Sequence, residues 1–422
     1  MLDDPEPGRQ PLITRLRNAR RLRILSQRDY GLFTLGNGIS LTGSWMQRIA
    51  LLWLVWDLTE SGFWLGILAT ADMLPVLVIS PLAGLAADRW DRLKQTRLSQ
   101  IVLTVIAGLL GLLLMLDLLS LPVLLLLVTA NGCMVALNQP ARMALVQSLV
   151  RREDVGTAVA LNSVNVNLAR LTGPAIAGAM IVFLDVEWVF IANAALTLVF
   201  VVILGFVHAS PMQKRDANGS MLSEIFGGLV FVFGDRGIRL LLGLLFLGGA
   251  GVRSVQDLFP AFAAQNFAST ATGLAALTSG MAVGAVAAGL TFGADAALHK
   301  LARRVVVSWV VAAIALAGLA LSASSLIDIG LVMVMGFFGA TSVIGTQTFV
   351  QLRTPDAMRG RTLSVHGLIS RASPALGALA CGWAFDHFGL AVPVLIATGL
   401  VLSAALLTMR QVWALGELKD ED

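Results

Sequence analysis

Twelve apolar segments, each long enough to cross a membrane as a helix, follow one another along this sequence. A spanning helix needs about 20 predominantly apolar residues. The composition agrees, because 57% of the residues are hydrophobic and 13% are charged, against about 25% charged in a soluble protein. Almost no sequence is left between the segments, which excludes a separate soluble domain and predicts an all-α integral membrane protein. The predicted spans are 32–58, 63–87, 96–117, 121–148, 158–183, 187–208, 237–263, 271–293, 305–324, 327–352, 361–384 and 389–410.

Lys and Arg occur in every second connection between these spans. Seven arginines precede the first span, whereas the connections around 59–62, 118–120, 184–187, 264–270, 325–328 and 385–388 contain neither residue. By the positive-inside rule the basic connections and both termini are cytoplasmic. The arginine-rich start has no small-residue cleavage site after a short apolar core, so we interpret it as a retained segment at the membrane surface. This charge pattern accounts for the net charge of +4 without nucleic acid as a partner.

The second half of the chain repeats the first at an offset of about 200 residues. Arg170 is matched by Arg371, and Asp185 by Asp386. Such an ordered repeat indicates a duplicated six-helix unit, which is typical of secondary transporters. The predicted parts are a basic cytoplasmic segment (1–30), a first bundle (31–208), a cytoplasmic linker with an interfacial helix from Ser223 to Asp235 (209–236), a second bundle (237–410) and a cytoplasmic tail (411–422).

Charged residues inside the predicted spans are the first candidates for a site, because an ionisable group in a membrane is costly and usually functional. Asp72 and Arg48 lie at similar depths in neighbouring spans and are expected to pair. Asp72 either carries a proton during transport or forms a permanent salt bridge with Arg48 or Arg371. Arg48, Arg170 and Arg371 do not titrate; they contact an anionic group, hold Asp72, or bond free carbonyl groups.

Further residues of these spans are candidates for the lining of a cavity. Arg253 and Asp257 are four residues apart, which favours an internal pair over a site. Asn165 shares a polar helix face with Arg170. Aromatic and methionine side chains either line an apolar pocket for amphipathic substrates or pack as ordinary core: Trp45, Met46, Trp53 and Phe259. No phosphate-binding loop, nucleophile elbow or His/Cys metal cluster occurs, and the two cysteines lie in apolar segments, so we expect no enzyme, cofactor or metal.

A charged turn, Gly84–Lys94, separates the second and third predicted spans. Five charges fall within the seven positions from Asp88 to Lys94. Charges that close to hydrocarbon must lie at a membrane edge. The turn therefore marks where one helix leaves the bilayer and the next enters.

Several motifs in this chain resemble those of the major facilitator superfamily, closest to its drug- and siderophore-exporting branch of macrolide-efflux and enterobactin-export proteins. The charged turn is similar to the signature between helices two and three, with Asp91 at the position of its second glycine. Helix five carries a sequence similar to the antiporter signature, with alanines at two usual glycine positions. The matching stretches are Gly84-Leu-Ala-Ala-Asp88-Arg89-Trp-Asp91-Arg92-Leu-Lys94, Gly173-Pro174-x-x-Ala177-Gly178, Gly43-Ser-Trp-Met-Gln-Arg48, Pro140-Ala-Arg142 and Met358-Arg-Gly-Arg361.

The resemblance implies twelve helices in two pseudo-symmetric bundles of a bacterial inner-membrane protein. It implies a cytoplasmic gate at Gly84, Asp88, Arg89, Arg92 and Lys94 and a helix-five motif at Gly173, Pro174 and Gly178. The expected function is proton-coupled export of small amphipathic compounds, drugs or siderophores, by rocker-switch alternating access. Lipids and protons are the other expected partners, and we expect a monomer. The alternatives are a transporter of lysophospholipid or another metabolite, and a non-transporting membrane sensor or scaffold.

Overall fold

The computed structural model describes residues 20–208, 229–293 and 297–417, with side chains throughout except at 20–22, 80–82, 84–89, 357 and 412–417. The described residues form helices and no strand. The first half contains α2 (Arg20–Leu25), α3 (Arg28–Thr59), α4 (Gly62–Arg89), α5 (Arg92–Met115), α6 (Leu121–Ser148), η1 (Arg152–Asp154), α7 (Val155–Leu184) and α8 (Glu187–Phe206). The second half contains α10 (Arg236–Gly248), η2 (Gly249–Arg253), η3 (Ser254–Leu258), α11 (Phe259–Asn266), α12 (Thr270–Thr291), α13 (Leu298–Leu321), α14 (Ser325–Arg353), α15 (Asp356–Phe388) and α16 (Ala391–Glu417).

The twelve predicted spans each coincide with a helix or, for 237–263, with the continuous run from α10 to α11. Ten of the described helical stretches are long and apolar enough to cross a membrane. The other two are α3 and α15, which have the length, 32 and 33 residues, but carry many polar side chains. Polar groups at membrane depth must face protein or a water-filled cavity. The fold class predicted from the sequence is confirmed.

Short turns with defined caps separate the helices. The Asp91 side chain accepts a hydrogen bond from the Lys94 amide at the start of α5, and Asp235 does the same for Ile238 at the start of α10. These caps satisfy amide groups that have no partner within the helix. Gly389 ends α15 with a φ of 76°, a conformation that glycine adopts at little cost. The interfacial helix expected from Ser223 lies outside the described residues up to 228, and residues 229–234 are helical.

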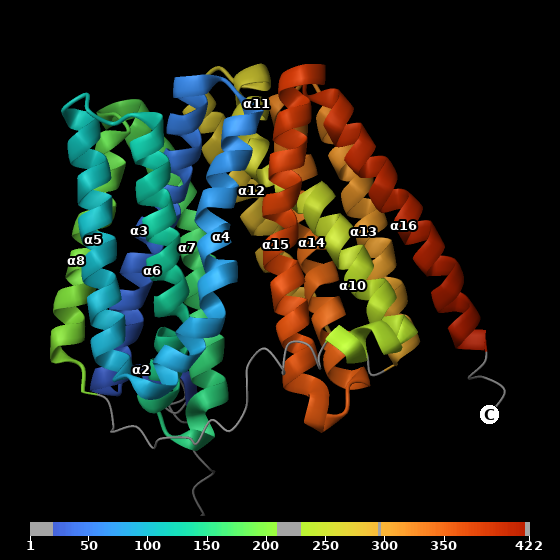
Figure 1. Cartoon of the computed structure of the whole chain (residues 1–422), viewed down its shortest axis with the longest axis horizontal. Coiled ribbons are helices and arrows are strands. Elements are labelled where there is room, and N and C mark those ends of the chain that lie inside the picture. Colours follow the sequence, from blue (N-terminus) through green and yellow to red (C-terminus); the bar gives the residue numbers. More distant parts are fainter. Residues whose placement is uncertain (1–19, 209–228, 294–296, 418–422) are drawn as a thin grey trace, which may run out of the picture.

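Each half packs mainly against itself. In the first half α3 packs against α7 and α8, and α4 packs against α6; in the second, α14 packs against α12 and α13. The halves meet mainly through two helix pairs, α4 with α15 and α7 with α12. Figure 1 shows α4 and α15 close together at the end of the molecule where α3 connects to α4 and α15 connects to α16. We call this end the turn end. The two helices diverge toward the opposite end of the molecule. We call this the linker end, because the described chain stops there at residue 208 and resumes at 229.

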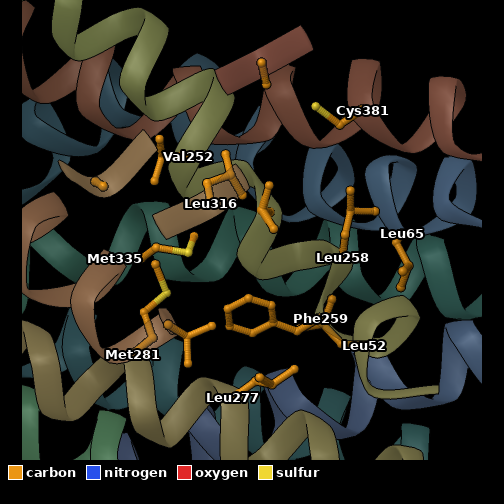
Figure 2. Close-up of a cluster of buried hydrophobic side chains, with 14 of the residues drawn as sticks. Leu52, Leu65, Val252, Leu258, Phe259, Leu277, Met281, Leu316, Met335 and Cys381 are labelled. Carbon is orange, nitrogen blue, oxygen red and sulfur yellow. The ribbon is translucent and has the colours of Figure 1, made fainter. Parts of the chain in front are cut away.

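Small residues allow the two halves to approach closely at the turn end. A Cβ atom on Gly66 would lie 2.6 Å from the Leu379 Cα, and one on Gly178 would lie 2.5 Å from the Ala275 Cβ. Glycine at such positions permits backbone-to-backbone contact between membrane helices. A buried apolar cluster completes this contact: Figure 2 shows Leu52 and Leu65 of the first half beside Leu258 and Phe259 of the second. The turn end is therefore closed by van der Waals packing.

Asp386, near the end of α15, adds a polar link at the turn end. Its carboxylate accepts hydrogen bonds from the Ser61 hydroxyl at 2.5 Å, the Gly62 amide at 2.7 Å and the Phe63 amide at 3.2 Å. These donors lie at the first turn of α4, where amide groups lack partners and the helix dipole favours negative charge. A residue of the second half thus caps a helix of the first half.

The crossing from α10 to α11 is irregular at its middle. The α-helix gives way to a π-helical turn at Gly249–Arg253 and then to a 3-10 turn at Ser254–Leu258. Irregular helical backbone at membrane depth is tolerated where it lines a cavity, and π-turns often mark functional sites. Both Arg253 and Asp257 lie in this irregular stretch.

Candidate functional site: a charged cavity between the halves

A chain of cavities lies between the two halves near the middle of the spans. One, of about 340 Å³, is lined mostly by α3, α4 and α6, and a second, of about 360 Å³, is lined by both halves. The two share Trp45, Arg48 and Asp257, and a third cavity shares Arg170 and Arg253 with the second. We call this connected space the central cavity.

Arg48, from the middle of α3, joins two carboxylates in the central cavity. Its Nη2 lies 2.6 Å from Oδ1 of Asp257, and its Nη1 lies 3.5 Å from Oδ2 of Asp72. Asp72 is on the neighbouring helix α4, whereas Asp257 belongs to the other half. Asn131 of α6 hydrogen-bonds the Asp72 carboxylate. Two carboxylates therefore share one guanidinium group, which leaves one negative charge without a partner in this triad.

None of the other cavity arginines has a carboxylate within ion-pair distance among the described residues, although Asp257 attracts Arg253 from farther away. The Arg170 guanidinium lies over the Trp45 ring, with its central carbon 5.3 Å from the ring centre. Arg253 donates to the Ser370 carbonyl at 2.9 Å and faces the Ser370 hydroxyl at 3.3 Å. Arg371 makes one 3.4 Å hydrogen bond, to the Gln139 side chain of the first half. This side of the cavity is thus strongly basic.

The structure brings the charged residues singled out inside the predicted spans to one cavity, from helices of both halves. Asp72, Arg48, Arg170, Arg253, Asp257 and Arg371 all line the central cavity, together with Trp45. The expected contact between Arg48 and Asp72 is present at 3.5 Å. Asp257 forms its ion pair with Arg48 of the other half, while Arg253 donates to Ser370. An ion pair between Arg253 and Asp257, which their four-residue spacing favours, is not among the ion pairs of the described residues.

Other predicted lining residues lie elsewhere. Met46 is 2% exposed and Phe259 is fully buried, both in the apolar core, and Trp53 packs against that core. Figure 2 shows the Phe259 ring surrounded by apolar side chains. Asn165 donates to the Thr34 carbonyl and lines a separate pocket between α3 and α7. These residues therefore stabilise packing around the cavity without lining it.

Three uncharged polar residues that line the cavity were not singled out from the sequence, namely Asn131, Gln256 and Ser370, and neither was Gln139, which accepts a hydrogen bond from Arg371. Asn131 follows ten residues of α6 that contain only one polar side chain, and this isolation is a signal that could have found it. Ser370 is next to Arg371 and acts through its carbonyl as well as its hydroxyl. Backbone contacts of this kind leave no trace in a sequence.

The charged turn lies at the linker end, between α4 and α5. The side chains of Gly84, Asp88 and Arg89 lie outside the described residues, so the gate role of Asp88 stays a prediction. Arg92 has a buried Nε with no hydrogen-bond partner among the described groups, and Lys94 is exposed.

The helix-five motif forms packing faces of α7. A Cβ on Gly173 would lie 2.6 Å from the Trp45 Cβ, so this glycine allows α3 to approach α7 at the level of the cavity. Gly178 does the same for α12, and Pro174 is buried within the helix. The motif thus sets the distance between α7 and its neighbours in both halves.

Comparison with known proteins places the chain in a family. The family model described as transmembrane secretion effector matches residues 23–422. The enterobactin exporter EntS of Citrobacter koseri is 27% identical over 86% of each chain, and the staphyloferrin A transporter of Staphylococcus aureus is 24% identical over 82% of this chain and 87% of its own. The uncharacterized MFS-type transporter YfiS of Bacillus subtilis is 31% identical over 52% of this chain; the match spans about half, 53%, of that relative.

Solved structures of similar fold are also transporters. The nucleoside transporter NupG superposes with a TM-score of 0.68 at 14% identity, covering 90% of this chain and 98% of its own. A D-xylose-proton symporter superposes with a TM-score of 0.69 at 17% identity, covering 90% and 96%. At such identities the likeness concerns the fold. The family match over nearly the whole chain, with the two six-helix halves and their central charged cavity, identifies this protein as a member of the transmembrane secretion effector family of major facilitator transporters.

Proposed function

We propose that this protein is a proton-coupled exporter of a small organic molecule of the siderophore or amphipathic drug class. The observation that carries the proposal is the triad in which Arg48 of the first half holds Asp72 at 3.5 Å and Asp257 of the second half at 2.6 Å. A charge network that joins both halves in the membrane interior is suited to couple ion binding to their relative movement. The siderophore class is supported by the relatives named as transporters of enterobactin and staphyloferrin A.

Asp72 is the proposed proton carrier of the triad. Asp72 is 32% exposed against 7% for Asp257, and it has the longer contact with Arg48. Proton uptake on Asp72 leaves Arg48 paired with Asp257 alone, which releases α4 from α3 while the link between the halves remains. In this proposal, protonation of Asp72 changes the contact between α3 and α4 and does not change the contacts that bind the substrate.

Rocking of the two halves is the proposed route of transport. Contacts at the turn end, namely the small-residue packing and the Asp386 carboxylate, support a state closed at that end and accessible from the linker end. The basic connections support a cytoplasmic linker end in the bacterial inner membrane. The substrate then enters from the cytoplasm in this state. Release follows when the turn end opens and the linker end closes.

Transport into everted membrane vesicles tests this function. We expect a siderophore such as enterobactin or staphyloferrin A, or an amphipathic drug, to accumulate when a proton gradient is present. Accumulation should disappear when a protonophore collapses the gradient. Accumulation that persists unchanged with the protonophore refutes proton coupling, and a lack of transport across the whole panel favours the non-transporting alternative.

Substitution of Asp72 tests its part separately. Asp72→Asn should abolish accumulation against a gradient but preserve exchange of labelled for unlabelled substrate, because exchange needs no net proton movement. Asp57→Asn, which changes an exposed carboxylate of α3 outside the cavity, is the matched control. Normal accumulation by Asp72→Asn between about pH 5.5 and 8, a range that spans ordinary protonation changes, rules Asp72 out as the carrier.

A further inference from the structure

We propose that Arg170, Arg253 and Arg371 form a binding site for a substrate that carries at least two anionic oxygen groups, such as carboxylates. We call these three residues the arginine face of the central cavity. The inference rests on the proposed transport function and deepens it, because it defines the charge that the substrate must have.

The charges that line the cavity do not balance. Its walls hold four guanidinium groups, those of Arg48 and the arginine face, and two carboxylates, those of Asp72 and Asp257. Four positive and two negative charges leave an excess of two positive charges. Arg371 is exposed, whereas Arg48, Arg170 and Arg253 are partly buried. Unpaired charge away from bulk water is costly, so the cost falls mainly on these three. A ligand with two negative charges balances this excess, whereas a cationic drug adds to it.

The excess charge is concentrated on the arginine face. Arg48 is already bound by two carboxylates, so it has little capacity left for a ligand. In contrast, none of the three arginines of the arginine face has a carboxylate within ion-pair distance among the described residues. Their guanidinium groups are therefore the available anion-binding groups of the cavity.

Two of these guanidinium groups are held in position in the absence of a ligand. Arg170 stacks on Trp45 and makes no hydrogen bond with a described residue, so its in-plane N–H groups remain free to donate. Arg253 uses Nη1 for the Ser370 carbonyl, which fixes its direction and leaves Nε and Nη2. A fixed planar guanidinium group suits two-point binding of a carboxylate.

The arginine face draws its members from both halves. Arg170 is on α7 of the first half, whereas Arg253 and Arg371 belong to the second. Arg170 and Arg253 line two of the cavities together, so they face each other across the interface. Their charges repel, and an anion between them replaces repulsion with attraction to both. The substrate would then act as a link that draws the halves together around it.

Equilibrium binding to the purified full-length transporter tests the inference. Acetate, succinate and citrate, which carry increasing negative charge, are titrated calorimetrically at constant ionic strength, with spermidine as a cationic probe. We expect citrate to bind at least tenfold more tightly than acetate, and spermidine not to bind. Equal binding of the three acids, or preference for spermidine, overturns the inference.

Substitutions then locate the site. Arg170→Gln and Arg253→Gln should each weaken citrate binding at least tenfold, and Arg170→Lys, which keeps the charge but loses the planar fork, should lie between. Arg239→Gln removes an exposed arginine outside the cavity and should leave binding unchanged. Unaltered citrate binding by Arg170→Lys and both glutamine variants refutes the site. The lysine variant provides this test even if a glutamine variant fails to fold.

The outcome is independent of proton coupling. Binding is measured without a gradient, so citrate binding that depends on the arginine face supports the inference even if transport proves insensitive to a protonophore. Conversely, proton-driven transport of neutral or cationic drugs, without citrate binding, supports the transport function and refutes the arginine face.

Discussion

Removal of the Asp386 carboxylate should open the turn end. Asp386 accepts three hydrogen bonds from the first turn of α4, and these bonds exist only while the two halves touch at that end. An interaction made in one state of a two-state equilibrium shifts the populations by its own free energy. Asp386→Ala therefore disfavours the state described here relative to the state that is open at the turn end.

The size of the effect follows from comparable helix caps. Loss of a side-chain cap at a helix N-terminus costs about 0.5–2 kcal/mol, and a carboxylate near the helix dipole adds about 0.3–1 kcal/mol. Because Asp386 is exposed to solvent, screening keeps the sum at the lower end of the combined range. We expect about 1–2 kcal/mol, which changes the ratio of closed to open molecules by about 5- to 30-fold.

Maleimide labelling of a cysteine at the turn end measures this shift. Leu65→Cys places the thiol where a fully buried leucine lies against Leu258 of the other half, in a background without Cys133 and Cys381. Labelling should be faster in Asp386→Ala and intermediate in Asp386→Asn, which keeps one acceptor oxygen. Asp57→Ala, an exposed carboxylate outside the interface, is the control. An unchanged labelling rate in Asp386→Ala refutes the role of this cap.

Three further perturbations test other contacts. Gly66→Ala should also speed labelling of Leu65→Cys, because its Cβ would lie 2.6 Å from the Leu379 Cα, whereas Gly205→Ala has open space and should not; equal rates contradict the close approach. Arg48→Gln should lower the free energy of unfolding in denaturant by about 2 kcal/mol, because it leaves two carboxylates without their cation. The expected loss is no larger because Arg48 and Asp72, the partners of the longer contact, are each about one-third exposed. An unchanged denaturation midpoint contradicts this expectation. Asp72→Asn should tighten citrate binding by up to about tenfold, because it removes a like charge from the cavity; weaker binding would mean that Asp72 contacts the ligand directly.

The spans and the main charged pair could be predicted because their signals are local. Hydropathy places α6 at residues 121–148, as the structure has it. Equal depth in neighbouring helices brought Arg48 and Asp72 together, since consecutive membrane helices run antiparallel through the same thickness. The packing of α4 on α15 joins residues more than 300 positions apart, and no periodicity within either helix specifies that contact.

The regular α-helical spacing expected for α10–α11 does not hold where the helix changes its winding. In an α-helix, residues four apart lie on one face, which favours a pair between Arg253 and Asp257. Arg253 ends a π-turn and Asp257 lies in the 3-10 turn that follows, so the rotation per residue differs from that of an α-helix. Asp257 therefore points to Arg48, and Phe259 points into the core. Just before the break, Gly248 packs against the Trp309 ring, a contact between distant residues that the sequence does not reveal.

The excess of two positive charges in the central cavity has a consequence for the energy source of transport. A membrane potential is worth about 2.3 kcal/mol per elementary charge per 100 mV. A ligand with two negative charges neutralises the cavity, so the loaded carrier crosses with no net charge. In the export cycle proposed above, the empty carrier returns with this positive excess of its cavity, which an inside-negative voltage pulls toward the cytoplasm. The voltage then acts on the return step, and depolarisation should slow turnover without changing substrate affinity.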